Sequence, residues 1–244
     1  MKAYRAILFD LYGTLADIHT DESRPGFWRA VAAWYTEHGA ACDALRLRRE
    51  YLALCAAETE RLRRETPGAA VEIDLTRVFR ALYEARGFAP DEALCAETAR
   101  YFRRRSTTHL RAYAGAGELL DALRAAGRTV ILLSNAQSCF TRPELARLGL
   151  AERFDHIYIS SEIGFQKPDP RFFNAPLRDL DLDPGDCVMI GNDPVCDAAG
   201  AMAVGMDAIL IRSALSPKGV PPPPGVEDFL PRMDLRRLRR LLLN

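Results

Sequence analysis

Five short apolar runs constrain the fold of this chain more than any other feature of its sequence. Each run is rich in Ile, Val or Leu, lacks the alternation of a half-exposed strand, and ends in small or polar residues. Strands that are covered on both faces of a parallel sheet have this pattern. The predicted strands are Ala6–Phe9, Thr129–Leu133, Ile157–Ser160, Cys187–Ile190 and Ala208–Ile211.

Helical patterns precede or separate the last four runs, at residues 117–126, 143–148, 170–180 and 197–204. This alternation predicts an α/β fold, a three-layer, doubly wound parallel sheet with a Rossmann-like core. Near the end of the chain, Arg236, Arg237, Arg239 and Arg240 alternate with leucines. That spacing favours an amphipathic helix with a solvated face over a nucleic-acid-binding segment.

The interval between the first and second apolar runs does not follow the alternation of strands and helices. About ninety residues pass without a strand signal, and glycine or Pro-Gly punctuates four helical patterns within them. This predicts a helical cap domain, residues 16–107, inserted into an α/β hydrolase core formed by residues 1–15 and 108–244. The predicted cap helices cover residues 26–38, 43–65, 74–86 and 90–105.

Charge and cysteine usage exclude several classes of protein. Lys plus Arg number 33 and Asp plus Glu number 33, so no global field draws the chain to nucleic acid or to an anionic membrane. We therefore expect a small-molecule substrate. The six cysteines form no C-x-x-C pair, and no apolar run is long enough for a signal peptide or a membrane span. A reducing cytoplasm is the expected compartment.

Polar residues follow the predicted strands, where ligands bind in an open parallel sheet. They are Asp10 and Tyr12, Ser134 and Asn135, Lys167, and finally Asn192, Asp193 and Asp197. Each has a structural explanation when taken alone, as a turn residue, a helix cap or an exposed loop lysine. Their convergence on one edge favours a functional site.

The three aspartates in this set predict a metal site. Carboxylates clustered without a cation would repel and raise one another's pKa values. Mg²⁺ suits a site with a few carboxylates, a backbone carbonyl and water or substrate oxygens. The expected cofactor is therefore Mg²⁺.

Four segments of the chain resemble the motifs of the haloacid-dehalogenase-like hydrolase superfamily. They are Ile7–Leu15, Leu132–Asn135, Lys167-Pro168 and Gly191–Asp197, and they occur in the superfamily's order at the ends of predicted strands. The helical insert is similar to a cap domain placed after the first motif. One motif would be weak evidence, whereas the ordered set is specific.

The resemblance implies a role for each matching residue. Asp10 is expected to be the nucleophile, which forms a covalent aspartyl intermediate, and Lys167 to steady it. Thr14, Ser134 and Asn135 are expected to bind the substrate. The expected Mg²⁺ ligands are Asp10, the backbone carbonyl of Tyr12, Asp193 and Asp197.

Tyr12 departs from the pattern of the superfamily's phosphatases, which carry a second aspartate there as general acid and base. Tyrosine at this position resembles the dehalogenase branch, but that branch replaces the metal-site acids that this chain keeps as Asp193 and Asp197. Bringing one charge of a phosphate to about 4 Å from Asp10 costs on the order of 4 kcal/mol at an effective dielectric of 20. A divalent cation offsets that cost.

The sequence therefore favours a magnesium-dependent phosphatase that acts on a small phosphorylated metabolite through an aspartyl phosphate. Two alternatives remain open, a metal-independent 2-haloacid dehalogenase and a non-catalytic scaffold that binds a phosphorylated ligand. Asp17 or His19 could replace the missing acid. Arg46, Arg48 or Arg49 could hold the carboxylate of a haloacid.

Overall fold

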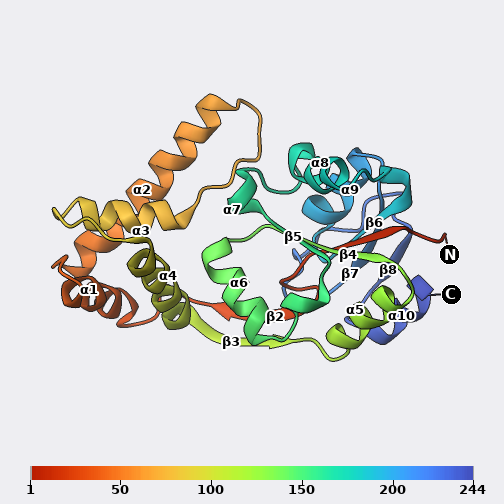
Figure 1. Ribbon diagram of the computed structural model, residues 1–244, viewed down its shortest axis with the longest axis horizontal. Helices are drawn as coiled ribbons and strands as arrows, with labels where there is room; N and C mark the ends of the chain where they lie inside the picture. The colour runs from red at the N-terminus through yellow and green to blue at the C-terminus, as the bar shows by residue number, and fades with distance from the viewer. Residues whose placement is uncertain (1, 244) are drawn as a thin grey trace.

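The computed structural model describes residues 2–243, and its centre is a six-stranded parallel sheet. The strand order is β5-β4-β1-β6-β7-β8, with helices packed on both faces (Figure 1). This confirms the predicted three-layer, doubly wound architecture. The strands are β1 (Ala6–Phe9), β4 (Thr129–Ser134), β5 (His156–Ile159), β6 (Cys187–Gly191), β7 (Asp207–Ile211) and β8 (Asp228–Leu230).

Alternate residues of the central strands supply the two apolar layers. Ile7 and Phe9 of β1 face one layer, and Ala6 and Leu8 face the other. The first layer packs against α5 (Ala116–Ala125), α6 (Ser138–Arg147) and α10 (Leu235–Leu243), and the second against α8 (Pro170–Asp179) and α9 (Gly200–Ala203). Both faces of the sheet are therefore buried, which explains why the strands read as continuous apolar runs.

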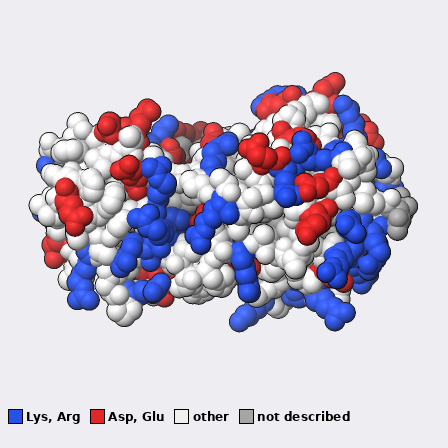
Figure 2. All heavy atoms as spheres, turned by 60° about the horizontal axis from the view of Figure 1, so that its bottom comes forward, with Lys and Arg blue, Asp and Glu red and all other residues white. Residues whose placement is uncertain are grey.

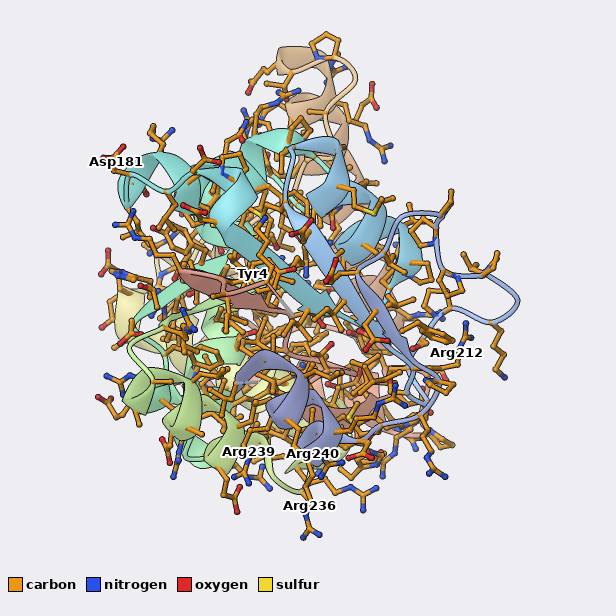
Figure 3. The ribbon with its side chains drawn as sticks, turned by 90° about the vertical axis from the view of Figure 1, so that its right-hand side faces the viewer. Tyr4, Asp181, Arg212, Arg236, Arg239 and Arg240 are labelled. Atoms are coloured by element: carbon orange, nitrogen blue, oxygen red, sulfur yellow. The ribbon has the colours of Figure 1, made fainter. Side chains whose placement is uncertain are left out.

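Helix α10 is amphipathic, as its spacing predicts. Its leucines 235, 238 and 242 are buried against the first apolar layer. Arg236, Arg239 and Arg240 point away from the sheet (Figure 3) and are exposed. The arginine run is thus the solvated face of a packed helix.

The helices within residues 27–106 form a body of their own, at the left of Figure 1. They are α1 (Phe27–Glu37), α2 (Ala44–Glu65), α3 (Leu75–Glu84) and α4 (Glu92–Ser106). A separate apolar cluster lies among them, centred on aromatic residues such as Tyr35, Phe79 and Phe102. Side chains of Asp43, Asp74 and Asp91 cap three of the four helices, as expected for a helix start.

Two strands connect this helical body to the sheet, and the sequence analysis missed them. β2 (Ala16–Thr20) pairs antiparallel with β3 (Thr107–Ala112). These segments are short and mostly exposed along β3, so they carry no strong strand signal. The domain boundaries at 15/16 and 107/108 remain a prediction.

Two further predictions about secondary structure were inaccurate, and one strand was missed. Helix α6 begins at Ser138, five residues before the predicted start, and Pro143 lies inside it. The predicted helix 197–204 is a π-helical turn, η3 (Pro194–Ala199), continued by α9. Strand β8 was not predicted, because a three-residue edge strand leaves little pattern. Short elements complete the chain: η1 (Ala151–Arg153), α7 (Ser160–Ile163) and η2 (Pro184–Asp186).

Within residues 2–243, no helix combines the length and the apolar character that a membrane crossing requires.

Candidate active site

Asp10 lies directly after β1, which pairs with β4 on one side and with β6 on the other. Its backbone N–H donates to the Ile190 carbonyl at 2.9 Å, which continues the pairing of β1 with β6. The chain then turns at Gly13, whose φ of 90° favours glycine. The hydroxyl of Thr14 donates to Asp10 Oδ2 at 3.3 Å. The Asp10 carboxylate is therefore held by the turn that follows it.

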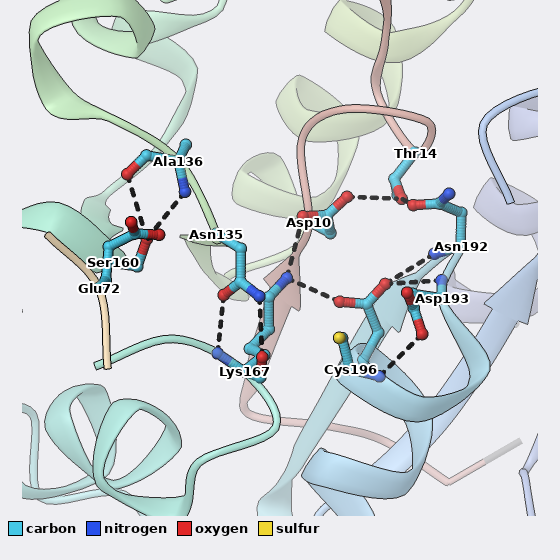
Figure 4. Close-up of polar contacts among 11 residues, drawn as sticks. Asp10, Thr14, Glu72, Asn135, Ala136, Ser160, Lys167, Asn192, Asp193 and Cys196 are labelled. Carbon is cyan, nitrogen blue, oxygen red and sulfur yellow. Dashed lines mark hydrogen bonds and ion pairs between the residues drawn. The ribbon is translucent and has the colours of Figure 1, made fainter. Parts of the chain in front are cut away.

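Lys167 is buried between two carboxylates (Figure 4). Its Nζ lies 2.9 Å from Asp10 Oδ1 and 2.7 Å from Asp197 Oδ1. One ammonium group thus faces two carboxylates, and the trio carries a formal charge of −1. The sequence predicted this convergence of three strand ends, and the structure brings the residues together.

Asn135 holds the loop that carries Lys167. Its Oδ1 accepts from the Lys167 N–H at 2.7 Å, and its Nδ2 donates to the Lys167 carbonyl at 2.9 Å. Both ends of the amide are therefore engaged with the backbone. The predicted role of Asn135 in substrate binding remains a prediction, and the observed geometry makes it a support for Lys167.

Ser134, the last residue of β4, is the unsatisfied polar group of this edge. It is fully buried, and its Oγ has no hydrogen-bond partner among the described residues. Buried hydroxyls are nearly always paired, so an unpaired one needs an explanation. A hydroxyl left free at the end of β4, the strand that pairs with β1, is suited to donate to a bound ligand.

The two aspartates after β6, Asp193 and Asp197, form different sets of hydrogen bonds. Asp197 Oδ2 accepts from the backbone N–H groups of Asn192 and Asp193, both at 2.9 Å. Asp193 Oδ1 accepts from Val195 and Cys196 N–H, both at 2.8 Å, and so caps η3. Figure 4 shows the Asp193 side chain directed toward that helix start rather than toward Asp10. The structure thus brings Asp197 to the trio and engages Asp193 elsewhere.

Asn192 is the residue at this edge to which the sequence analysis gave no role. With its amide oriented to satisfy both ends, its nitrogen lies 3.1 Å from the Tyr12 carbonyl and 3.3 Å from Asp10 Oδ2. A Cβ at Gly13 would come within 2.5 Å of this amide, so the glycine makes room for it. Within residues 2–243, no cluster of three or more His, Cys, Asp or Glu is arranged to hold a metal.

Burial and the charge of Lys167 shift the pKa of Asp10 in opposite directions. Burial, followed by the charge of Asp197, raises the pKa of Asp10, and Lys167 lowers it, so that the pKa lies at about 6. Burial would lower the pKa of Lys167, but the charges of Asp10 and Asp197 outweigh burial and raise it. Lys167 therefore stays protonated across the physiological range, and it keeps Asp10 able to ionise despite its burial.

The Tyr12 hydroxyl forms hydrogen bonds with α6 and none with Asp10. The hydroxyl lies 3.0 Å from Thr141 Oγ1 and donates to the Glu144 carboxylate, both on α6. Arg103 of α4 pairs with the same carboxylate, with Nε 2.6 Å from Glu144 Oε1. The Arg103 guanidinium also lies over the Tyr12 ring, 5.7 Å from its centroid. Burial and the Glu144 charge raise the pKa of Tyr12.

The alternative acids and arginines considered from the sequence are engaged elsewhere or exposed. Asp17 pairs with Arg111 at 2.8 Å, and His19 Nδ1 lies 2.9 Å from Thr108 Oγ1, so both side chains bond across the β2–β3 pair. Arg46, Arg48 and Arg49 are exposed on α2. The insert's arginine beside the Tyr12 loop is Arg103, which the sequence analysis did not identify.

A segment of the helical insert also docks on the Lys167 loop. Residues 70–72 run antiparallel to residues 164–166, with Glu72 N–H donating to the Gly164 carbonyl at 2.9 Å and Gln166 N–H donating to the Ala70 carbonyl at 2.9 Å. Asp169 Oδ2 accepts from Ala70 N–H at 3.0 Å. The insert therefore helps to position the loop that carries Lys167.

Comparison with known proteins agrees with this geometry. The family model of haloacid dehalogenase-like hydrolases matches residues 4–205, and the chain belongs to that family. A solved structure of a HAD phosphatase from Thermococcus onnurineus matches with a TM-score of 0.61 at 20% identity, over 98% of this chain and 97% of that one. At that identity the likeness shows the shared fold.

Curated relatives include both phosphatases and dehalogenases. A phosphoserine phosphatase from Thermus thermophilus is 35% identical over 142 residues, which are 58% of this chain and 56% of the relative. The chain spans about half the length of this and two other curated phosphatases that it matches. An (S)-2-haloacid dehalogenase from Pseudomonas sp. is 29% identical over 228 residues, 89% of this chain and 88% of the relative. The predicted class of hydrolase is confirmed, and its substrate is not.

Proposed function

We propose that this protein is a magnesium-dependent phosphatase that transfers the phosphoryl group of a small phosphate monoester to Asp10. The observation that carries the proposal is the convergence of oxygens beside the nucleophile. The Tyr12 carbonyl and Asp10 Oδ2 both lie 3.1 to 3.3 Å from one atom, the amide nitrogen of Asn192. The Asn192 amide now donates to both of these acceptors, and a cation would take its place between them.

The side chains present fit a weakly held Mg²⁺. Asp10, the Tyr12 carbonyl and the amide oxygen of Asn192, after rotation of that amide, would supply oxygen ligands, and Mg²⁺ takes few protein ligands and keeps its waters. To coordinate the same Mg²⁺, Asp193 would have to give up its hydrogen bonds at the start of η3, and Asp197 would have to give up its ion pair with Lys167. When bound, Mg²⁺ would act as a Lewis acid that offsets the charge of the phosphate.

Asp10, Lys167 and Ser134 would each have a separate role in phosphoryl transfer. Asp10 would attack phosphorus with one carboxylate oxygen, which breaks the bond to the leaving oxygen and forms an aspartyl phosphate. Lys167, fixed by Asn135 and Asp197, would remain protonated and stabilise the negative charge on the transferring group. The free hydroxyl of Ser134 would donate to a phosphoryl oxygen. Water would then hydrolyse the intermediate and restore the Asp10 carboxylate.

The arrangement of Tyr12 limits the substrates. Its hydroxyl is bonded to Glu144 and Thr141, so the leaving oxygen must take its proton from solvent. General acid catalysis contributes roughly a hundred- to ten-thousand-fold. We therefore expect phosphate esters with good leaving groups to be hydrolysed much faster than alkyl phosphates.

A 2-haloacid dehalogenase is the second candidate, because the side chain beside Asp10 Oδ2 is the Asn192 amide, whereas a carboxylate there would favour a metal. Attack on a neutral carbon needs no cation to offset the charge of the electrophile. The full-length similarity to the Pseudomonas dehalogenase also supports it.

One assay separates the candidates. The full chain is incubated with p-nitrophenyl phosphate or 2-chloropropionate, each with Mg²⁺ and with EDTA, and phosphate and chloride release are measured, with Asp10→Asn as the control. Phosphate release that stops in EDTA supports the proposal. Chloride release that continues in EDTA supports the dehalogenase. If neither product forms above the Asp10→Asn background, the chain is a non-catalytic binding scaffold.

A further inference from the structure

A cavity lies between α4, β3 and α6, and the Arg103–Glu144 pair forms part of its wall. It has a volume of about 370 Å³, and none of the residues predicted for catalysis or substrate binding lines it. Arg100 and Arg104 enter it from α4, His109 from β3 and Arg147 from α6. Figure 2 shows Lys and Arg side chains gathered on this face, where the helical body and the sheet meet. The cavity therefore joins the two parts of the molecule.

Positive charge in the cavity is not balanced by the protein itself. Arg104 and Arg147 have no carboxylate within 4.0 Å in the described part of the chain, and Arg100 has only the exposed Glu97 at 3.9 Å. The one acidic residue of the wall, Glu144, is buried and paired with Arg103 at 2.6 Å. Because the whole chain has no net charge, this is a local excess of arginine.

A smaller neighbouring hollow extends the same basic surface. It has a volume of about 230 Å³, shares Arg104 and Thr107 with the first cavity, and adds Arg24 and Arg105. Neither added arginine has a carboxylate within 4.0 Å among residues 2–243. An anion with more than one charged group could therefore reach guanidinium groups in both hollows.

The arginine side chains that line the cavity favour an anionic ligand. Guanidinium groups present paired donors that match phosphate and carboxylate oxygens. A cavity of this size holds a small molecule, and Arg104 and Arg147 line it from two separate helices. We propose that this cavity is a binding site for a small multivalent anion, which carries two or more phosphate or carboxylate groups and is held by Arg104 and Arg147.

Occupation of the site would act on the junction between insert and sheet. Arg104 belongs to α4 of the helical insert, and Arg147 to α6, which follows β4 of the sheet. A ligand held by both arginines would tie the two helices together beside the Arg103–Glu144 pair. Since that pair also holds Tyr12, the ligand would stabilise the arrangement of the Tyr12 loop without touching Asp10.

Calorimetric titration of the full-length Asp10→Asn protein with pyrophosphate, in EDTA, tests the proposal without relying on turnover. The double variant Arg104→Ala/Arg147→Ala is compared with Arg48→Ala/Arg49→Ala, which removes the same charge from exposed positions on α2. We expect the first pair to weaken binding by about a hundredfold, since it removes two charge-assisted contacts, and the second to leave Kd unchanged. Circular dichroism confirms that both variants fold.

Three results would overturn the proposal. Equal weakening by both double variants would mean that pyrophosphate responds only to net charge. Loss of binding in Ser134→Ala, with Arg104→Ala/Arg147→Ala unaffected, would place the anion in the active site. Tighter binding of a single-stranded oligonucleotide than of pyrophosphate would identify a nucleic-acid surface instead. Repeating the titration with citrate shows whether carboxylate or phosphate is the preferred group.

Discussion

The two sides of Asp10 are built differently. On one side, Lys167, Asp197 and Asn135 form a closed set of buried contacts that come entirely from the ends of sheet strands and the loops after them. On the other side, Tyr12 turns its hydroxyl from the nucleophile to Glu144, 132 residues later in the chain, and Arg103 of the insert covers it. The first side sets the charge at the nucleophile, and the second determines which proton donors are within reach.

In the proposed reaction, the two sides would therefore assist different chemical steps. Ionising Asp10 and stabilising charge on the transferring group need only the Lys167 side. Protonation of the leaving group needs a donor on the Tyr12 side, where the hydroxyl is already engaged. Variants on the Lys167 side should therefore have large effects on both activity and stability, and variants on the Tyr12 side small ones.

The largest effect is expected for Asp10→Asn. The amide is nearly isosteric but cannot form the covalent intermediate, so turnover should fall by about 10⁴-fold or more. Lys167 keeps Asp197 as its partner, and the fold should be retained. Turnover measured beside circular dichroism checks this. Substantial activity in the folded variant would rule out an aspartyl intermediate.

Lys167→Met should be the next most severe change. It leaves Asp10 and Asp197 buried without a cation, and breaking a buried pair from one side typically costs about 3 to 5 kcal/mol. The free energy of unfolding from urea titration gives the measurement. Lys167→Met/Asp197→Asn is the matched control, because it removes the uncompensated charge and should recover part of the stability without recovering activity. No recovery would mean that packing, and not charge, explains the loss.

A comparison of neighbouring residues sharpens the assignment of the metal ligands. Asn192→Asp adds a carboxylate beside Asp10 and should tighten Mg²⁺ binding by about tenfold, since ligand charge controls affinity. Asp193→Asn should change Mg²⁺ affinity little if Asp193 only caps η3, because asparagine caps helices as well as aspartate does. Calorimetric titration with Mg²⁺ decides. Weaker binding in Asp193→Asn would instead support the ligand set expected from the sequence.

The sheet and the Lys167 side could be predicted from the sequence because their signals are local. Buried strands are continuous apolar runs, and polar residues placed just after them must meet at one edge of a parallel sheet. Lys167 and Asp197 were found in this way. The β2–β3 pair was missed because exposed, short strands carry no such run, and α6 was started late because Pro143 was taken as its first residue.

The Tyr12 side could not be predicted in the same way, because its contacts are not local. Nothing near Tyr12 in the chain indicates Glu144 or Arg103, which arrive from two other helices. Asn192 and Asp193 are adjacent, and only the direction of each side chain shows that Asn192 faces Asp10 while Asp193 caps a helix. The sequence favoured Asp193 because carboxylates are better Mg²⁺ ligands, and side-chain direction in a loop has no sequence pattern.

The smallest effect is expected for Tyr12→Phe, which tests whether the Tyr12 side contributes to chemistry at all. The substitution keeps the ring under Arg103 and removes only the hydroxyl, so Glu144 retains Arg103 as its partner and stability should fall by about 1 kcal/mol, the usual net value of a hydrogen bond. Because burial raises the pKa of Tyr12 and its proton is held by Glu144, the hydroxyl should not donate a proton to the leaving group.

We expect kcat/KM of Tyr12→Phe to change less than about threefold, and by the same factor for p-nitrophenyl phosphate and for an alkyl phosphate. A general acid would instead be worth roughly a hundredfold or more, and mainly for the alkyl ester, whose leaving group needs the proton. A loss confined to the alkyl ester would therefore show that Tyr12 releases Glu144 when substrate binds, and that the two sides of Asp10 act together.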